Sequence, residues 1–110
     1  MLLPNHAAAY VPEEKLIGYL LNTEHPIGGS KARLLARYGF TIANANVFAA
    51  ALLSSAAQDQ VSSRQQTPHG RKFIVDGELP TPRGTTLRIR SVWIIDRGAT
   101  APRLVPAYPR

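Results

Sequence analysis

The spacing of apolar residues changes once along this chain, near residue 60, and that change limits the folds available to it. Before it, apolar residues recur every three or four positions, as in amphipathic helices. After it, they alternate with polar residues, as in strands with one buried face. Helices followed by strands indicate an α+β fold. The length fits one domain, residues 1–110, with a helical half (1–58) and a sheet half (59–110).

Three helices are predicted in the first half. The first starts after Pro12 and ends near Asn22, and the second covers residues 31–38 with Ser30 as its N-cap. Gly39 is expected as the residue that ends the second helix, with Phe40 packing back onto it. A third helix ends near Ala57, and its expected apolar stripe contains Val47, Phe48, Ala51, Leu52 and Ser55.

Four strands are predicted in the second half, at residues 60–66, 71–79, 87–95 and 103–108. Short turns between consecutive strands indicate an antiparallel meander, with the N-terminal helices packed on one face of the sheet and the other face open. In the third strand, the odd positions from Leu87 to Ile95 are expected to face the helices. Arg88 and Arg90 then lie on the open face.

The positive charge is concentrated after residue 30. The chain has 13 Lys and Arg against 7 Asp and Glu, a net charge of +6. Residues 1–30 hold one lysine and three glutamates, whereas residues 31–110 hold twelve basic and four acidic residues. A basic segment of this kind is typical of proteins that bind polyanions. The alternative is a set of solvated arginines that bind no polyanion.

Basic residues of the sheet half are candidates for phosphate binding. Arg88 and Arg90 are two positions apart on one strand, so they lie on one side about 7 Å apart. With Lys72 they would form a phosphate-binding face, since guanidinium groups bind phosphate through paired hydrogen bonds. Arg71 and His69 flank this face in or beside a Pro-His-Gly turn. The alternatives are a solvated charged face and an inert surface histidine.

His25 and Lys31 are candidates for catalysis. His25 precedes a Gly-Gly turn that leads into a helix N-terminus, where anions bind readily, and histidine transfers protons near neutral pH. Lys31 lies in the first turn of that helix, where the helix dipole disfavours a cation, so an anionic ligand is indicated. The alternative is that His25 caps the turn and that Lys31 is solvated.

Several classes of chemistry are excluded. Without cysteine there is no disulfide, thiolate zinc site or cysteine nucleophile, and no metal-ligand spacing, phosphate-binding P-loop or serine elbow is present. No cofactor is therefore expected. No apolar stretch approaches the roughly 20 residues of a membrane helix, and no signal peptide is recognisable, so we expect no membrane partner. RNA cleavage remains compatible, because the RNA 2′-hydroxyl can act as the nucleophile without a metal.

Four stretches of the chain resemble a small bacterial and phage-associated domain family. Residues 16–40 read LIGYLLNTEHPIGGSKARLLARYGF, similar to the family's LLNxEHPxGxxKA segment followed by Gly-Phe. The TPHG turn at 67–70 is similar to the family's TPYG turn, and RSVWI at 90–94 and PRLVPAYP at 102–109 are similar to its last two strands. The family in turn resembles the barnase, EndoU, colicin-RNase and RelE superfamily.

The resemblance implies a function and a set of site residues. Members of that superfamily are metal-independent ribonucleases that act as toxins, usually with an antitoxin or immunity protein. The positions that match are His25, Lys31, Arg90, Ser91, Trp93 and Tyr108. His69 stands where the family tends to have Tyr, so a catalytic role shared across the family is not expected for it. Pro106 stands where the superfamily often has Thr, which bears on whether this copy cleaves RNA.

The sequence thus predicts a metal-independent ribonuclease toxin domain that acts on RNA. His25, Lys31 and Arg90 are the predicted catalytic residues. The predicted substrate-binding residues are Arg71, Lys72, Arg88, Ser91, Tyr108 and His69. An acidic antitoxin or immunity protein is the expected partner, and the expected place of action is the cytoplasm of the producing or of a target cell. The alternatives are a non-catalytic nucleic-acid-binding module and a basic domain that binds an acidic protein.

Overall fold

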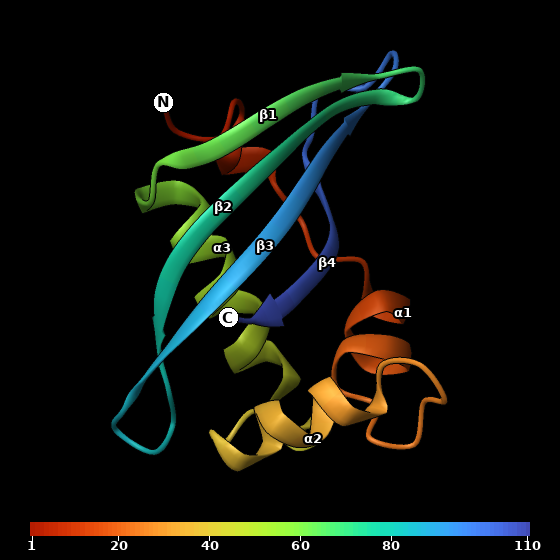
Figure 1. Cartoon of the computed structure of the whole chain (residues 1–110). Coiled ribbons are helices and arrows are strands. Elements are labelled where there is room, and N and C mark those ends of the chain that lie inside the picture. The colour runs from red at the N-terminus through yellow and green to blue at the C-terminus, as the bar shows by residue number, and fades with distance from the viewer.

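The computed structural model describes every residue from Met1 to Arg110 and confirms the α+β class. Helices lie on one face of a four-stranded antiparallel sheet with strand order β1-β2-β3-β4 (Figure 1). The helical segments are η1 (His6–Ala8), α1 (Glu13–Lys15), η2 (Leu16–Leu20), α2 (Gly29–Arg37), η3 (Ile42–Asn44) and α3 (Ala45–Gln58). The strands are β1 (Val61–Thr67), β2 (Gly70–Pro80), β3 (Thr86–Asp96) and β4 (Arg103–Pro109).

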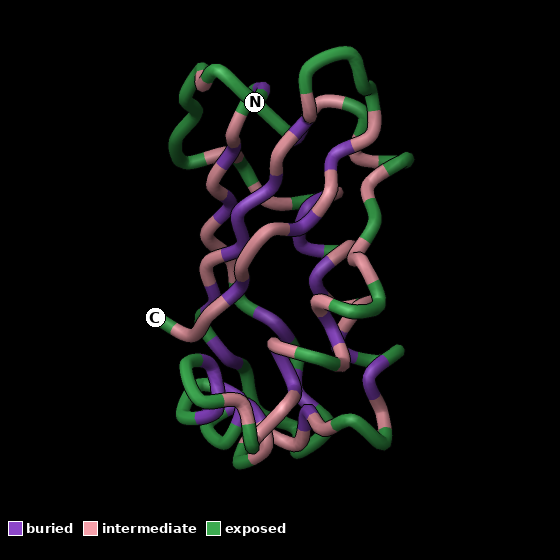
Figure 2. The backbone as a smooth tube through the Cα atoms, turned by 90° about the vertical axis from the view of Figure 1, so that its right-hand side faces the viewer, coloured by how far each residue is buried: buried purple, intermediate pink, exposed green.

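The alternation predicted for β3 is confirmed. Its odd positions from Leu87 to Ile95 face the helices, and each is at most 4% exposed. Arg88 is exposed and Arg90 is half-buried on the opposite, open face. In β2 the buried side chains Phe73, Val75 and Leu79 also fall at odd positions, whereas β1 contains no buried residue. The buried residues lie in the interior of the molecule (Figure 2). The sheet therefore has one face in the core and one face available for function.

The first predicted helix contains an irregularity that the periodicity does not reveal. After the single turn of α1, residues Leu16–Leu20 form a π-helical turn, in which the Leu21 amide donates to the Leu16 carbonyl at 3.0 Å. This wider turn places Leu16 and Leu21 on one side, and both are buried in the core. Packing in the core, rather than the local spacing of apolar residues, therefore determines the backbone conformation of this turn.

Helix α2 starts earlier than predicted and ends as predicted. It begins at Gly29 with Gly28 as N-cap, so the expected cap at Ser30 is wrong. Gly39 has a φ of +96°, which favours glycine, and the Phe40 amide donates to the Leu35 carbonyl at 3.0 Å. This hydrogen bond folds Phe40 back into the core, where it is fully buried.

Helix α3 packs on the sheet through a stripe that differs from the predicted one at its start. Phe48, Leu52 and Ser55 are buried as expected, together with Ala45 and Ala56. Val47 is 43% exposed, because the buried side follows a spacing that begins at Ala45. No single helix is long and apolar enough to cross a membrane. One bent pair of helical segments reaches the required length and apolar composition when taken together: Gly29–Arg37 and Ile42–Gln58, which meet at 67°.

The N-terminal segment completes the core and pairs with β4, which the sequence did not predict. Leu3 is 1% exposed and belongs to the main hydrophobic cluster. Tyr10 forms a parallel bridge with Arg103, and its amide donates to the Pro102 carbonyl at 3.0 Å. The segment therefore covers part of the outer edge of β4, where unpaired backbone groups would otherwise be exposed.

Candidate functional site

Helix α2 and strands β3 and β4 bring three of the predicted residues together. The Lys31 ammonium group, from the first turn of α2, lies 4.9 Å from the centre of the Tyr108 ring on β4. Tyr108 is paired in register with Arg90 on β3. Two cations thus flank one phenol at the end of the open sheet face. We call Lys31, Arg90, Tyr108, Asp76 and Arg110 the Tyr108 site.

Asp76 on β2 fixes the position of Arg90. The Arg90 Nε and Nη2 atoms donate to the two carboxylate oxygens of Asp76 at 2.8 and 3.1 Å. The Arg110 guanidinium lies 3.1 Å from the same carboxylate, which also accepts a hydrogen bond from the Ser62 hydroxyl at 3.1 Å. Two cations and a hydroxyl therefore hold one carboxylate, and the charge of the Tyr108 site stays positive.

The same contacts shift two pKa values in opposite directions. The hydrogen bond from Arg90, partly opposed by burial, holds the pKa of Asp76 below its ordinary value. The bond to Asp76, followed by a hydrogen bond to Tyr108, raises the pKa of Arg90. Asp76 is consequently ionised at neutral pH and suited to positioning Arg90 rather than to proton transfer, while Arg90 stays a cation.

His25 caps its own loop. Its Nδ1 atom accepts hydrogen bonds from the amides of Ile27 and Gly28, both at 3.1 Å. The imidazole also meets the Tyr19 ring edge to face, with ring centres 4.6 Å apart. These contacts make Nδ1 the acceptor nitrogen, so Nε2 carries the ring proton and acts as a hydrogen-bond donor. The backbone joins His25 to the start of α2, since its carbonyl accepts the Gly29 amide at 2.9 Å, but no side-chain contact joins it to the Tyr108 site.

The structure separates the other predicted binding residues. Arg88 is exposed on the open face, and with Arg110 and Asp76 it lines a hollow of about 200 Å³ beside the Tyr108 site. Lys72 lies on the same face but four residue pairs from Arg90, because it pairs with Ile94. That separation amounts to about 13 Å along the strand.

Arg71 and His69 lie elsewhere. Arg71 is on the helix side of β2, where its guanidinium stacks 5.8 Å from the centre of the Phe73 ring. His69 is at the exposed tip of the β1–β2 hairpin, and its carbonyl accepts the Arg97 amide at 2.8 Å. The predicted phosphate-binding face therefore divides between the two sides of the sheet.

Ser91 and Trp93 belong to the core, and neither is accessible. Both are 0% exposed. The Trp93 Nε1 atom donates to the Ser91 hydroxyl at 2.8 Å, and that hydroxyl donates in turn to the Val75 carbonyl at 3.4 Å. The pair satisfies two buried polar groups inside the sheet–helix interface. The structure thus gives Ser91, predicted to bind substrate, a packing role with no surface for a ligand.

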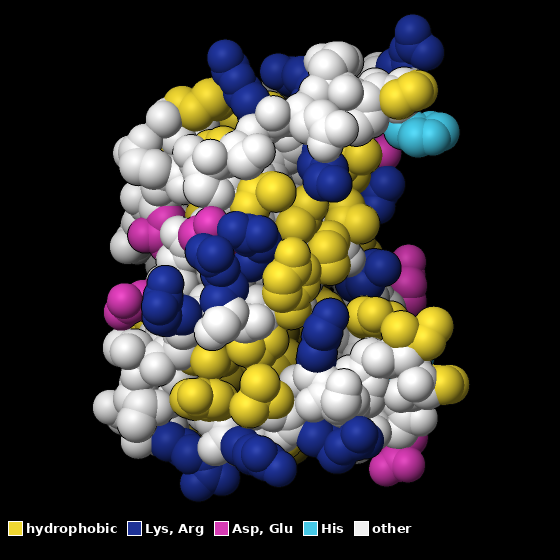
Figure 3. All heavy atoms as spheres, viewed as in Figure 1, with side chains coloured by type: hydrophobic (Ala, Val, Ile, Leu, Met, Phe, Trp, Pro, Cys, Tyr) yellow, Lys and Arg dark blue, Asp and Glu magenta, His cyan; other side chains and the backbone are white.

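An apolar stripe crosses the open face, and its residues were not among those predicted to form the site. It lies between lysines and arginines (Figure 3). Ile74, Val92, Ile94, Val105 and Pro106, with Lys72 and Tyr108 at its borders, line a groove of about 280 Å³. Val92 is only 6% exposed although no helix covers this face. The apolar even positions of β3 were the available signal, because side chains two apart share a face.

No group of three or more histidine, aspartate or glutamate side chains is arranged to hold a metal ion. What the fold and the site define is an α+β domain that presents a cationic cluster around a tyrosine on the open face of its sheet. The sequence profile described as a domain of unknown function, DUF6883, matches residues 2–110. The chain therefore belongs to the DUF6883 family.

One solved structure shares this fold over almost its whole length. It is described as a contact-dependent growth inhibition toxin–immunity protein complex from Klebsiella pneumoniae 342. The two chains align with a TM-score of 0.73 over 96% of each, at 15% sequence identity. At that identity the likeness shows the fold alone. No curated protein matches the sequence.

Proposed function

We propose that this chain is a toxin domain that cleaves RNA without a metal ion, with the Tyr108 site as its active centre. The observation that carries the proposal is the convergence of Lys31 and Arg90 on Tyr108, from a helix and a strand far apart in the sequence. Hydroxyl and cationic groups at one accessible point are what phosphodiester cleavage requires. The fold shared with a chain of a toxin–immunity protein complex supports a toxin-related or immunity-related class.

The reaction would use the RNA itself as nucleophile. The 2′-hydroxyl loses a proton and forms a bond to the adjacent phosphorus, and the bond from phosphorus to the 5′-oxygen of the next nucleotide breaks. The products are a 2′,3′-cyclic phosphate and a 5′-hydroxyl, which receives a proton. Lys31 and Arg90 would stabilise the negative charge that builds up on the phosphoryl oxygens. Asp76 would hold Arg90 in place for that task.

Two groups of this chain are candidates for the proton transfers. The Tyr108 hydroxyl, on a ring that Lys31 contacts and on the residue paired with Arg90, would donate to the leaving oxygen. His25 is the candidate that takes the proton from the 2′-hydroxyl, which its ring would accept at Nδ1 in place of the Ile27 and Gly28 amides, since Nε2 carries the proton in this tautomer. Arg88 would bind a neighbouring phosphate from the same face. With cellular RNA as the substrate, the domain would act in the cytoplasm of the producing cell or of a target cell.

The test is incubation of the purified protein with total RNA in the presence of EDTA. We expect fragments that end in a 2′,3′-cyclic phosphate, with cleavage lost in Tyr108→Phe and in the double variant His25→Ala with Lys31→Ala. Lys15→Ala is the matched control, since Lys15 also lies over a tyrosine ring, at 5.3 Å from Tyr19, outside the Tyr108 site. Absence of cleavage under all conditions, or full cleavage by the double variant, would rule out the assignment.

The apolar stripe favours a second candidate function, binding of an acidic protein. Aliphatic side chains flanked by cations suit a partner that offers apolar residues surrounded by carboxylates. An immunity protein that binds here would also cover Tyr108, which borders the groove. Cell killing on expression separates the two: a toxin domain kills and a mere binding domain does not. Salt-dependent RNA binding without any product would indicate a non-catalytic RNA-binding module instead.

A further inference from the structure

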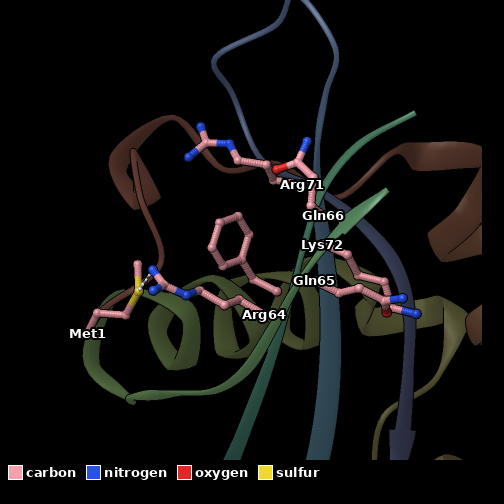
Figure 4. A pocket seen from close by; sticks show the side chains of 7 residues that line it. Met1, Arg64, Gln65, Gln66, Arg71 and Lys72 are labelled. Atoms are coloured by element: carbon pink, nitrogen blue, oxygen red, sulfur yellow. Dashed lines mark hydrogen bonds between the residues drawn. The ribbon is translucent and has the colours of Figure 1, made fainter. Parts of the chain in front are cut away.

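A second group of cations lies on the helix side of the sheet, at the end that carries the β1–β2 hairpin. Its hollow of about 310 Å³, here called the arginine pocket, is lined by Met1, Arg64, Gln65, Gln66, Arg71, Lys72 and Phe73. In Figure 4, Arg64 and Arg71 reach to one side of the hairpin, while Gln65 and Lys72 point to the other. The pocket thus opens on the side of the sheet opposite to Tyr108.

No carboxylate neutralises the arginine pocket. Ion pairs to Asp76 and Asp96 involve only Arg90, Arg103 and Arg110. The Arg71 guanidinium stacks on Phe73, and Arg64 has a single weak contact, from Nη1 to the Met1 sulfur at 3.6 Å. Both arginines are exposed, and most of their guanidinium N–H donors have no protein acceptor.

The spacing of the two arginines matches one tetrahedral anion. Arg64 pairs with Phe73, and Arg71 pairs with Gln66, so the arginines are diagonal neighbours on adjacent antiparallel strands. Such neighbours lie about 7–8 Å apart, and their Cβ atoms are somewhat closer. Two long guanidinium side chains at this spacing can converge on one phosphate, and without an anion they repel each other.

The positive surface continues past the pocket. Arg71 also lines a second hollow, of about 330 Å³, together with Arg97 and with Asp96, whose carboxylate is paired with Arg103. Arg97 is exposed and has no ion pair. The cations therefore form a band around this end of the sheet rather than one isolated site.

We propose that the arginine pocket binds a phosphodiester group of RNA at a place separate from the Tyr108 site, an assignment that rests on RNA being the substrate. A strand held at both places runs from the open face around the hairpin end of the sheet to the helix side. The inference thus extends the substrate from the few nucleotides at the cleaved bond to a longer RNA. Guanidinium pairs recognise the phosphate backbone without reading the bases, so this contact adds affinity rather than sequence preference.

The test measures binding of a labelled 20-nucleotide RNA with 2′-O-methyl groups, which cannot be cleaved by the proposed reaction. The variant Arg64→Gln with Arg71→Gln is compared with Arg37→Gln and Arg83→Gln, a double variant with the same loss of charge at exposed positions elsewhere. We expect about tenfold weaker binding at about 0.1 M salt for the first only. Its slope of log affinity against log salt should fall by about 0.7, for one lost phosphate contact on a single strand.

A third double variant tests the guanidinium geometry. Arg64→Lys with Arg71→Lys keeps the charge and removes the forked donors, so the salt slope should persist while affinity still falls several-fold. Circular dichroism checks that every variant is folded. Equal losses for the pocket variant and its Arg37 and Arg83 control would overturn the proposal, because they would reveal only a generic attraction to positive charge.

Separate outcomes of these experiments identify the phosphate ligand of the pocket and test the proposed ribonuclease activity. Binding of inorganic phosphate or AMP that depends on Arg64 and Arg71, with unchanged RNA affinity, would assign the pocket to a small phosphorylated ligand and overturn the RNA inference. Because binding is measured with an uncleavable RNA, it does not depend on catalysis. Pocket-dependent binding without cleavage of natural RNA would refute the proposed ribonuclease and leave the second site standing.

Discussion

The Tyr108 site and the arginine pocket both gather cations, but only the first contains a carboxylate. In the Tyr108 site, Asp76 binds Arg90 through two hydrogen bonds and holds Arg110 as well. In the arginine pocket, Phe73 and Met1 support the arginines through packing. A cation held in a fixed position suits catalysis, because the reaction rate depends on where the charge lies. Arginines without an ion pair suit the binding of an anionic ligand. Four predictions test this difference, from the largest effect to the smallest.

The largest effect is expected on cleavage. Lys31→Ala should lower the rate of RNA cleavage about 100-fold, since it removes one of two cations from the transition state. Arg71→Ala, in the arginine pocket, should lower it no more than a few-fold at saturating RNA. The measurement is the rate of oligonucleotide cleavage at several RNA concentrations. Comparable losses in the two variants would contradict the division between a chemical site and a binding site.

The next effect is on stability. Asp76→Asn leaves Arg90 and Arg110 without their anion and should lower the free energy of unfolding by about 1–2 kcal/mol, the range for a charge-assisted hydrogen-bonded pair that is partly exposed. Glu78→Gln is the control, two residues along the same strand, exposed and without an ion pair. Urea unfolding gives both values. An Asp76→Asn protein as stable as the control would mean that Asp76 does not brace the site.

The pH dependence of stability should reveal the same contact between Asp76 and Arg90. Because hydrogen bonds from Arg90 and Arg103 hold the pKa values of Asp76 and Asp96 below their unfolded values, these groups stabilise the fold above about pH 4. That contribution should disappear as the pH falls from about 4 through the folded pKa values. Urea unfolding at pH 7 and pH 3 should show a smaller difference for Asp76→Asn than for wild type. An unchanged difference would show that Asp76 is not the linked group.

The smallest effect is expected in the arginine pocket. Arg64→Gln and Arg71→Gln should each change the free energy of unfolding by less than about 0.5 kcal/mol, as is usual for exposed positions without an ion pair. The double variant should bind RNA more weakly all the same. A large loss of stability would indicate that these arginines serve the fold and not a ligand.

Local pattern predicted the parts of the site that depend on one strand or one turn. The even positions of β3 placed Arg88 and Arg90 on the open face, because successive side chains of a strand alternate between faces. The alternative weighed for His25, that it caps its turn, is what its Nδ1 atom does. Arg71 was predicted to flank the face that contains Lys72, although the same alternation sends these neighbours to opposite sides of the sheet.

Contacts between segments that are distant in the sequence could not be predicted from local patterns. Lys31 and Tyr108 are 77 positions apart, and their meeting depends on where α2 packs against the end of β4. The partnership of Arg90 with Asp76 depends on the register of β2 against β3. A shift of one residue in that register would have changed the partner, and the sequence alone did not specify it.

By itself, the sequence determined the order of helices and strands, the buried face of β3 and the concentration of basic residues after residue 30, because each follows from local periodicity or composition. Only the tertiary structure decided which cations a carboxylate holds in place and which have no ion pair. Those outcomes depend on strand register and helix packing, which join groups that no local pattern relates.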